Sequence, residues 1–254
     1  LVFGSLVIRR RTLWFGFAPA ALASGVGVLA HAIWLSCVLV SLQLGVPAGI
    51  VALIIAPQPM LTGAFSGYVV GEPTPPERWL GLIVAFGGVL ITVLARSTLD
   101  LQEGASLLAY LLPFGSVVAM AGAMLLQRRV EVRHRNWLLP LPVALFYQSL
   151  ASVLVLAVPA VFLEHLFARW TPEFVLVMAW LIIGVSLGAY GVLWLLLSRI
   201  DATRLASLFY FGPPVTMVMA WAAFGDTVQA SDVVGLLVVL AGVLLTQRRA
   251  KERR

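Results

Sequence analysis

The amino-acid sequence predicts an all-α polytopic membrane protein, and two observations lead to this fold class. Of its 254 residues, 61% are hydrophobic and only 11% are charged, whereas soluble domains carry about 25% charged residues. Apolar runs of about 18 or more residues, which are typical of membrane-spanning helices, follow one another almost to the end of the chain. The alternation of polar and apolar residues that marks a transmembrane β-barrel is absent from the sequence.

Each apolar run is expected to form one span. Eight full spans are predicted, at residues 14–42, 48–70, 79–96, 105–127, 138–163, 174–197, 202–224 and 232–247. Residues 1–8 are apolar but too short to cross about 30 Å of hydrocarbon, so we interpret them as the end of a ninth helix. A cleavable signal peptide is the alternative. It requires basic residues before the apolar stretch, whereas here the basic residues Arg9, Arg10 and Arg11 follow it.

Lysine and arginine residues are distributed unequally between the two ends of the predicted spans. Of the 17 such residues, fifteen fall on one side, and only Arg96 and Arg169 fall on the other. The positive-inside rule places the basic side in the cytoplasm. This predicts a multi-pass protein of the cell (inner or plasma) membrane with a cytoplasmic C-terminus and a basic tail at 249–254. Because the charges cluster at span ends, we interpret them as topology anchors and expect no nucleic-acid partner.

The chain contains an internal repeat. With a shift of 154 residues, positions 46–92 show twelve identities in 47, whereas composition alone gives about 10%. The identities include Pro59 with Pro213 and Gly71 with Gly225, and proline and glycine fix backbone geometry. The offset is five spans, an odd number, so the second copy enters the membrane from the opposite side. Such inverted-topology repeats are typical of secondary transporters. They predict ten helices in full, of which about eight are complete here, so we expect the chain to be N-terminally truncated.

The motifs of the two copies resemble those of the drug/metabolite transporter superfamily, EamA-like branch. Small residues, a proline, a Gly-acid helix end and a Gly-x6-Gly helix occur in AGIVALIIAPQPMLTGAFSGYVVGEPTPPERWLGLIVAFGG and again in ATRLASLFYFGPPVTMVMAWAAFGDTVQASDVVGLLVVLAG. The resemblance implies a first repeat over 1–98, lacking its first helix and most of its second, and a five-helix second repeat over 104–248. It also implies transport of small metabolites. One departure is that the second copy ends in Gly-Asp rather than Gly-Glu.

Four prolines interrupt the equivalent predicted spans: Pro57 and Pro59 in the first copy, and Pro213 and Pro214 in the second. A proline inside a helix removes one backbone hydrogen bond, and in lipid the freed carbonyl needs another partner or a wet cavity. Symmetric breaks near mid-membrane therefore predict a substrate site or a hinge. A simple packing kink is the alternative.

Glycines spaced by four residues predict close helix packing. We expect such packing at Gly63, Gly67 and Gly71, and at the pair Gly184 and Gly188. Glu72 and its counterpart Asp226 lie at predicted helix ends. There we expect each acid to end its helix and to pair with a neighbouring arginine or a backbone N–H, and a role in a gate is the alternative.

The polar residues inside the spans are neutral, because none of the eleven acidic residues falls deep in a span. This argues against a cation exporter driven by an intramembrane carboxylate. Aromatic, amide and hydroxyl groups suit an amphipathic or amino-acid-like metabolite. We expect the substrate cavity to be lined from this set: His31, Trp34, Gln58, Thr62, Ser116, Tyr190, Trp194, Tyr210 and Thr216. His31 is the only histidine within a span, and it serves either as a proton relay or as a hydrogen bond between helices.

The function predicted from these features is secondary active transport of small organic metabolites, with export as the expected direction, by alternating access between the two repeats. A non-transporting scaffold or channel is the alternative, and an intramembrane enzyme is a further one. GVSLG (Gly184–Gly188) matches the G-x-S-x-G pattern, but it lies in an apolar helix rather than at a strand–turn–helix junction. We therefore expect no enzymatic activity, no cofactor and no metal. The bilayer and a small-molecule substrate are the expected partners, proton coupling is left open, and the protein is expected to be a monomer or homodimer.

Overall fold

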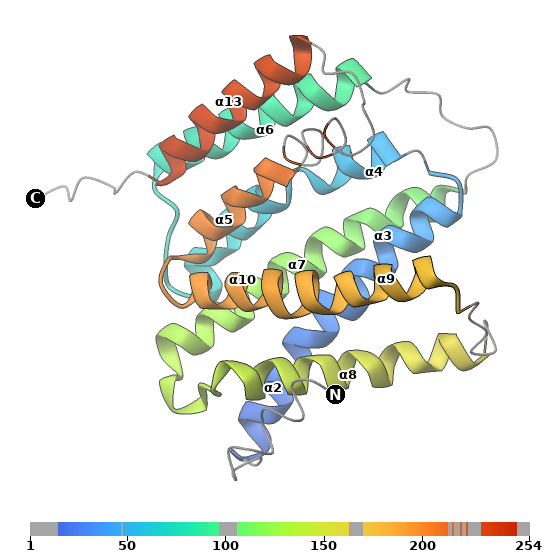
Figure 1. The fold of residues 1–254 in the computed structure, drawn as a ribbon. Helices are drawn as coiled ribbons and strands as arrows, with labels where there is room; N and C mark the ends of the chain where they lie inside the picture. Colours follow the sequence, from blue (N-terminus) through green and yellow to red (C-terminus); the bar gives the residue numbers. More distant parts are fainter. Residues whose placement is uncertain are drawn as a thin grey trace, which may run out of the picture.

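All described elements of the computed structural model are helices (Figure 1). The structure describes residues 15–46, 48–96, 106–162, 170–212, 215, 219, 222 and 230–247. No strand occurs among these residues, and five of their helical segments are long and apolar enough to cross a membrane. The predicted all-α membrane fold is therefore confirmed.

The helices follow the chain in one order. They are α2 (Phe17–Gly27), the π-helix η1 (Val28–Ile33), α3 (Trp34–Gln43), α4 (Ala48–Ile55), α5 (Gln58–Val69), α6 (Pro76–Arg96), α7 (Leu107–Arg133), the 3-10 helix η2 (Arg135–Trp137), α8 (Leu141–Phe162), α9 (Pro172–Trp180), the π-helix η3 (Leu181–Ala189), α10 (Tyr190–Leu197), α11 (Ala202–Ser207), the 3-10 helix η4 (Leu208–Phe211) and α13 (Ala230–Gln247). Two of the long segments are composite: α2, η1 and α3 form one, and α9, η3 and α10 form the other.

The helix boundaries differ from the predicted spans mainly in α7. The span predicted at 105–127 continues as helix to Arg133. Its last turns contain glutamine, arginine and glutamate, which are good helix formers. The helix therefore continues past the end of the apolar run. The span predicted at 202–224 begins as α11 and η4, and most of its second half lies outside the described residues.

Two segments wind as π-helices, which the period of the sequence does not predict. Shifted by 154 residues, η1 corresponds to 182–187, and these residues lie inside η3. The helix is therefore widened at two places that the shift of 154 residues relates to each other. π-Helical turns are rare and frequently lie at functional sites.

Helices α6 and α13 lie side by side and run in opposite directions (Figure 1). A Cβ atom placed on Gly88 would lie 2.6 Å from the backbone nitrogen of Val239, and one on Gly81 would lie 2.7 Å from the carbonyl oxygen of Gly242. No side chain fits at these positions, so the two helices touch backbone to backbone. Under the shift of 154 residues, the contact of Gly81 with Gly242 becomes that of Gly235 with Gly88, which is also present.

The main core lies between α2, α7, α8, α10 and α11, and its large buried members include Met124, Trp194 and Leu197. A second cluster joins α6, α13 and η4 around Leu82 and Tyr210. The α5–α6, α7–α8 and α10–α11 turns and the end of α13 share the left side of Figure 1. We call this side the basic end, because the arginines of these turns and their flanking helix ends gather there: Arg78, Arg128, Arg129, Arg133, Arg135, Arg199 and Arg204.

Candidate functional site

The span that carries Pro57 and Pro59 is broken at these prolines. Helix α4 ends at Ile55, a turn follows, and α5 begins at Gln58. Because proline has no N–H, the carbonyls of Leu53 and Ile55 lack the donor that a continuous helix supplies four residues ahead. The chain resumes its helix through the Pro57 carbonyl, which accepts from the N–H groups of two residues of α5, Met60 at 2.9 Å and Leu61 at 3.1 Å.

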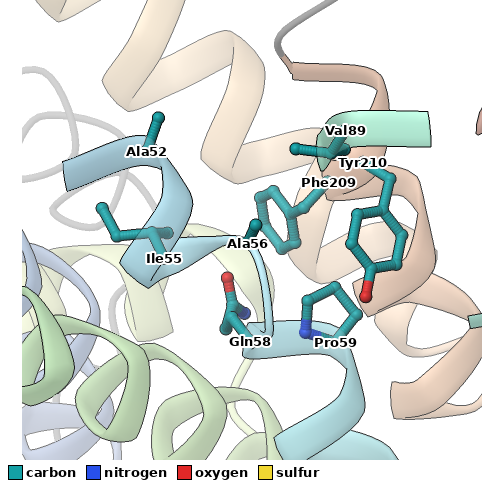
Figure 2. A pocket seen from close by; sticks show the side chains of 8 residues that line it. All are labelled: Ala52, Ile55, Ala56, Gln58, Pro59, Val89, Phe209 and Tyr210. Atoms are coloured by element: carbon teal, nitrogen blue, oxygen red, sulfur yellow. The ribbon is translucent and has the colours of Figure 1, made fainter. Parts of the chain in front are cut away.

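A cavity of about 230 Å³ opens at this break (Figure 2). Its wall consists of Ala52, Ile55, Ala56, Gln58, Pro59, Val89, Phe209 and Tyr210. These residues come from α4, the turn, α5, α6 and η4, and in Figure 2 the Phe209 ring lies between Ala56 and Tyr210. The wall is mainly apolar with few polar groups, as in most small-molecule sites. Its volume is below the about 300–1,000 Å³ of pockets for drug-sized ligands, so it fits a small molecule.

Two polar side chains of the wall have unused hydrogen-bonding capacity. Tyr210 is 2% exposed, and its hydroxyl has no hydrogen-bond partner among the described residues. Among the described residues, the Gln58 amide nitrogen donates only to the sulfur of Met124, at 3.6 Å, and a thioether is a weak acceptor. A buried hydroxyl without a partner is energetically costly. The Tyr210 hydroxyl and the Gln58 amide are therefore the groups of this wall that a bound molecule can satisfy.

The other predicted cavity residues of this region have different positions. Thr62 donates to the Gln58 carbonyl at 3.1 Å, and Ser116 donates to the Pro113 carbonyl at 2.6 Å. Both hydroxyls are buried and bonded within their own helices, and neither residue lines the cavity. Trp34 packs against the main core. Pro213, Pro214 and Thr216 lie outside the described residues.

A second polar cluster lies between η1, α8 and α10. The Trp194 indole N–H donates to Gln148 Oε1 at 2.9 Å, and His31 Nε2 lies 3.4 Å from the same oxygen. The Tyr190 hydroxyl donates to the Ala30 carbonyl at 2.9 Å, and the Tyr190 and His31 rings lie 3.9 Å apart between centroids. The structure thus brings His31, Tyr190 and Trp194 together, but away from the cavity at the helix break. The contact of His31 with Gln148 joins η1 to α8, as expected for a hydrogen bond between helices.

Gln148 joins this cluster without having been among the predicted cavity residues. A single amide in an apolar run has no spacing signal that would single it out. The two π-helices border the cluster, because His31 lies in η1 and Tyr190 directly follows η3. The bond from Tyr190 to Ala30 therefore ties the two widened segments together.

Ion pairs join several helices at the basic end. Arg128, near the end of α7, binds the Glu72 carboxylate of the α5–α6 turn and donates to the Leu197 carbonyl at the end of α10. The arginine partner expected for Glu72 is therefore Arg128. Arg78, at the start of α6, lies 3.0 Å from the Asp201 carboxylate, which also caps the first turn of α11. Both ion pairs connect a residue before position 98 to one after position 104.

The predicted packing glycines divide into different roles. A Cβ on Gly63 would lie 3.2 Å from the Leu82 side chain, so this glycine packs closely against α6. Gly67 faces the following turn at Pro73, and Gly71 has φ 90° and turns the chain out of α5. Gly184 and Gly188 face no neighbouring helix among the described residues, because the nearest atoms belong to Trp180 and Ile183 of their own segment. Packing of that pair remains a prediction.

Metal-ligating side chains do not cluster in the described part of the chain. No group of three or more His, Cys, Asp or Glu side chains lies close enough there to hold a metal ion. The described features therefore define a class, an all-α membrane protein with a proline-broken span beside a small cavity.

Comparison with known proteins places the chain beside membrane transporters. A protein named uncharacterized transporter YvbV, from Bacillus subtilis (strain 168), is 24% identical over 210 residues, which cover 82% of this chain and 66% of that protein. A protein named "Probable amino-acid metabolite efflux pump", from Salmonella typhimurium strain LT2, is 22% identical over 214 residues, covering 81% of this chain and 69% of that protein. The chain thus spans about two thirds of the length of these relatives. No protein-family model matches it.

A solved crystal structure has the same fold. It matches with a TM-score of 0.74 at 18% sequence identity, and the match covers 97% of this chain and 82% of that chain. At this identity the likeness concerns the fold alone.

Proposed function

We propose that the protein is a secondary transporter that moves small organic metabolites across the membrane by alternating access between two inverted repeats. The observation that carries this proposal is the break between α4 and α5, where Gln58 and the unpartnered Tyr210 hydroxyl line one cavity. Discontinuous helices near mid-membrane are where many transporters bind their substrates. The two polar groups in an apolar wall suit an amphipathic or amino-acid-like molecule.

The packing of α6 against α13 supports the inverted repeat. Two helices related by a two-fold axis in the membrane plane run antiparallel, and equivalent residues exchange partners across the axis. The glycine contacts do so, because Gly81 meets Gly242 and Gly235 meets Gly88. We therefore propose that 1–98 and 104–248 form the two repeats of a protein of the drug/metabolite transporter superfamily.

The ion pairs at the basic end support alternating access. Glu72 with Arg128, and Arg78 with Asp201, hold the two proposed repeats together at that end. In this proposal a substrate reaches the cavity from the opposite end while the pairs hold, and from the basic end after they break. The positive-inside rule makes the basic end cytoplasmic. The names of the two relatives, a transporter and an amino-acid metabolite efflux pump, favour small metabolites and export.

The proposal is tested by flux from proteoliposomes. The vesicles are loaded with a mixed pool of amino acids and related metabolites, and release is followed by mass spectrometry with and without a pH gradient. We expect selective release of one chemical class, and the gradient dependence shows whether protons are coupled. No selective flux from folded protein favours the scaffold alternative.

Two matched substitutions test the cavity itself. Tyr210→Phe removes only the unpartnered hydroxyl, so we expect transport of the selected substrate to fall about three- to tenfold, the loss of one hydrogen bond. Tyr68→Phe is the control, because Tyr68 is 88% exposed. This variant should transport the substrate as fast as the unmodified protein does. Equal transport by both variants would mean that the cavity at the helix break is not the substrate site.

A further inference from the structure

We infer that a second small-molecule site lies at the basic end, between α7, α8 and α10. The geometry points to a ligand with a hydrogen-bond acceptor, such as a carboxylate, at its inner end and a cationic amine at its outer end. This site is separate from the cavity at the helix break, and its existence does not depend on the proposed transport function.

The site is a pocket of about 180 Å³. Its apolar wall includes Leu138, Leu141, Leu195 and the ring of Trp194. Its polar groups are Gln148 on the inner side and Glu131 toward the outside, with Gln127 and Ser198, which donate to Glu131 and to the Leu195 carbonyl. Gln148 is 0% exposed, whereas Glu131 lies in the last turns of α7 and is partly exposed. The pocket therefore has a buried amide at one end and a carboxylate at the other, joined by a mainly apolar wall.

The hydrogen bond from Trp194 fixes the orientation of the Gln148 amide. An indole N–H is only a donor, so the amide atom 2.9 Å from it is the oxygen, Oε1. His31 approaches the same oxygen. The amide nitrogen, Nε2, is fully buried and has no partner among the described residues. Gln148 therefore offers donors to a molecule in the pocket, and the molecule must present an acceptor.

The position of Gln148 is rigid. A side chain on Gly27 of α2 would collide with the Gln148 backbone, so α2 and α8 are in direct backbone contact there. Ser152, one turn further along α8, donates to the Gly27 carbonyl at 3.0 Å and strengthens this contact. A donor held in place by such packing loses little freedom when it binds a ligand.

The outer polar group is the Glu131 carboxylate, which presents a negative charge to a ligand in the pocket. The Glu131 carboxylate accepts from Gln127 at 3.3 Å. The positive charges of Arg128 and Arg135 also interact with the Glu131 carboxylate, but neither arginine lines the pocket. Arg128 is already bound to the Glu72 carboxylate and the Leu197 carbonyl. A molecule in the pocket therefore faces a carboxylate, which attracts a cationic amine.

The order of these groups favours a free molecule over a lipid headgroup. The ammonium of an ethanolamine headgroup is its leading end, so it would enter first and meet the amide donors of Gln148. A free ω-amino acid can enter with its carboxylate first, which places its ammonium near Glu131 and its methylene chain along the apolar wall.

The test is equilibrium binding of small probes to the protein in phosphatidylcholine nanodiscs. The two-ended probes are γ-aminobutyrate, δ-aminovalerate and ε-aminocaproate, which differ in length, and the one-ended probes are valerate and pentylamine. We expect saturable binding of at least one two-ended probe, with both one-ended probes about tenfold weaker or more. The absence of saturable binding by any two-ended probe to folded protein would overturn the inference.

Two variants separate the two ends of the site. Gln148→Met removes the amide donors at similar length and should weaken both the best two-ended probe and valerate. Glu131→Gln keeps the shape and the acceptor for Gln127, so it should weaken the two-ended probe about tenfold and leave valerate unchanged. Val153→Ala is the control on the same helix, because Val153 is 63% exposed, and it should bind as the unmodified protein does.

Unchanged binding of the two-ended probe in Glu131→Gln would overturn the inference, and this variant stays informative if Gln148→Met fails to fold. A second arm uses nanodiscs containing phosphatidylethanolamine. Undiminished probe binding there supports a free ligand, and loss of binding would identify the lipid headgroup as the occupant and overturn the choice of ligand.

Discussion

The Arg128 guanidinium binds both oxygens of the Glu72 carboxylate. Its Nη2 lies 2.6 Å from Oε1, and its Nε lies 3.1 Å from each of the two oxygens. Its Nη1 donates to the Leu197 carbonyl at 2.9 Å. One side chain therefore joins the end of α7 to the α5–α6 turn and to the end of α10. The two side chains are only 15% and 25% exposed, so solvent screens the pair less than it screens a surface salt bridge.

This pair should stabilise the basic end measurably. A double-mutant cycle of Glu72→Gln and Arg128→Gln should give a coupling energy of about 1–2 kcal/mol, measured by unfolding in detergent. Each single change leaves one charge without its partner, so the double variant should be more stable than the sum of the single effects predicts. Additive effects would show that the pair contributes nothing at this end.

Two neighbouring glycines of α6 should respond in opposite ways to the same change. In Gly88→Ala the new methyl would lie 2.6 Å from the Val239 backbone nitrogen, so we expect a loss of about 1–3 kcal/mol from overpacking. In Gly87→Ala nothing lies within 4 Å of the new methyl. That change should be neutral or stabilising by up to about 1 kcal/mol, because alanine is the better helix former. Thermal unfolding compares the two, and equal effects would contradict the backbone contact between α6 and α13.

The helix break should matter more for transport than for folding. Replacing Pro57 and Pro59 by alanine restores the missing N–H groups and allows a continuous helix through the cavity wall. We expect flux in proteoliposomes to fall by about tenfold or more, with folding and expression nearly unchanged. Pro159→Ala is the control, because Pro159 lies exposed in α8 away from the cavity. Normal flux in the double variant would show that transport does not require the helix break.

The sequence predicted the features that depend on local chemistry. The apolar runs predicted the helices, and Pro57 and Pro59 predicted the break, because a proline removes a backbone donor wherever it stands. The arginine partner of Glu72 was expected from its place at a helix end. The identity of that partner was not, because Arg128 lies in a helical extension of α7 that continues past the apolar run.

Features that depend on tertiary packing were not predicted. The π-helices η1 and η3 add a residue to a turn without any change in composition that marks them. The spacing of Gly63, Gly67 and Gly71 suggested one packing stripe, yet Gly71 ends α5 with a positive φ, and spacing alone does not separate these roles. His31 and Trp194 meet at Gln148, and the Tyr190 ring packs against His31; no sequence separation indicates these contacts.

The most direct test of alternating access measures which side of the membrane reaches the cavity. Cys37 is the only cysteine of the chain, so Ala56→Cys in a Cys37→Ser background places one thiol on the cavity wall. A membrane-impermeant maleimide is added to one side of the proteoliposomes at a time. We predict labelling from the side opposite the basic end, and a shift toward the basic side when Glu72→Gln and Arg128→Gln are added. Equal labelling from both sides, or labelling that the added changes do not alter, would contradict the account.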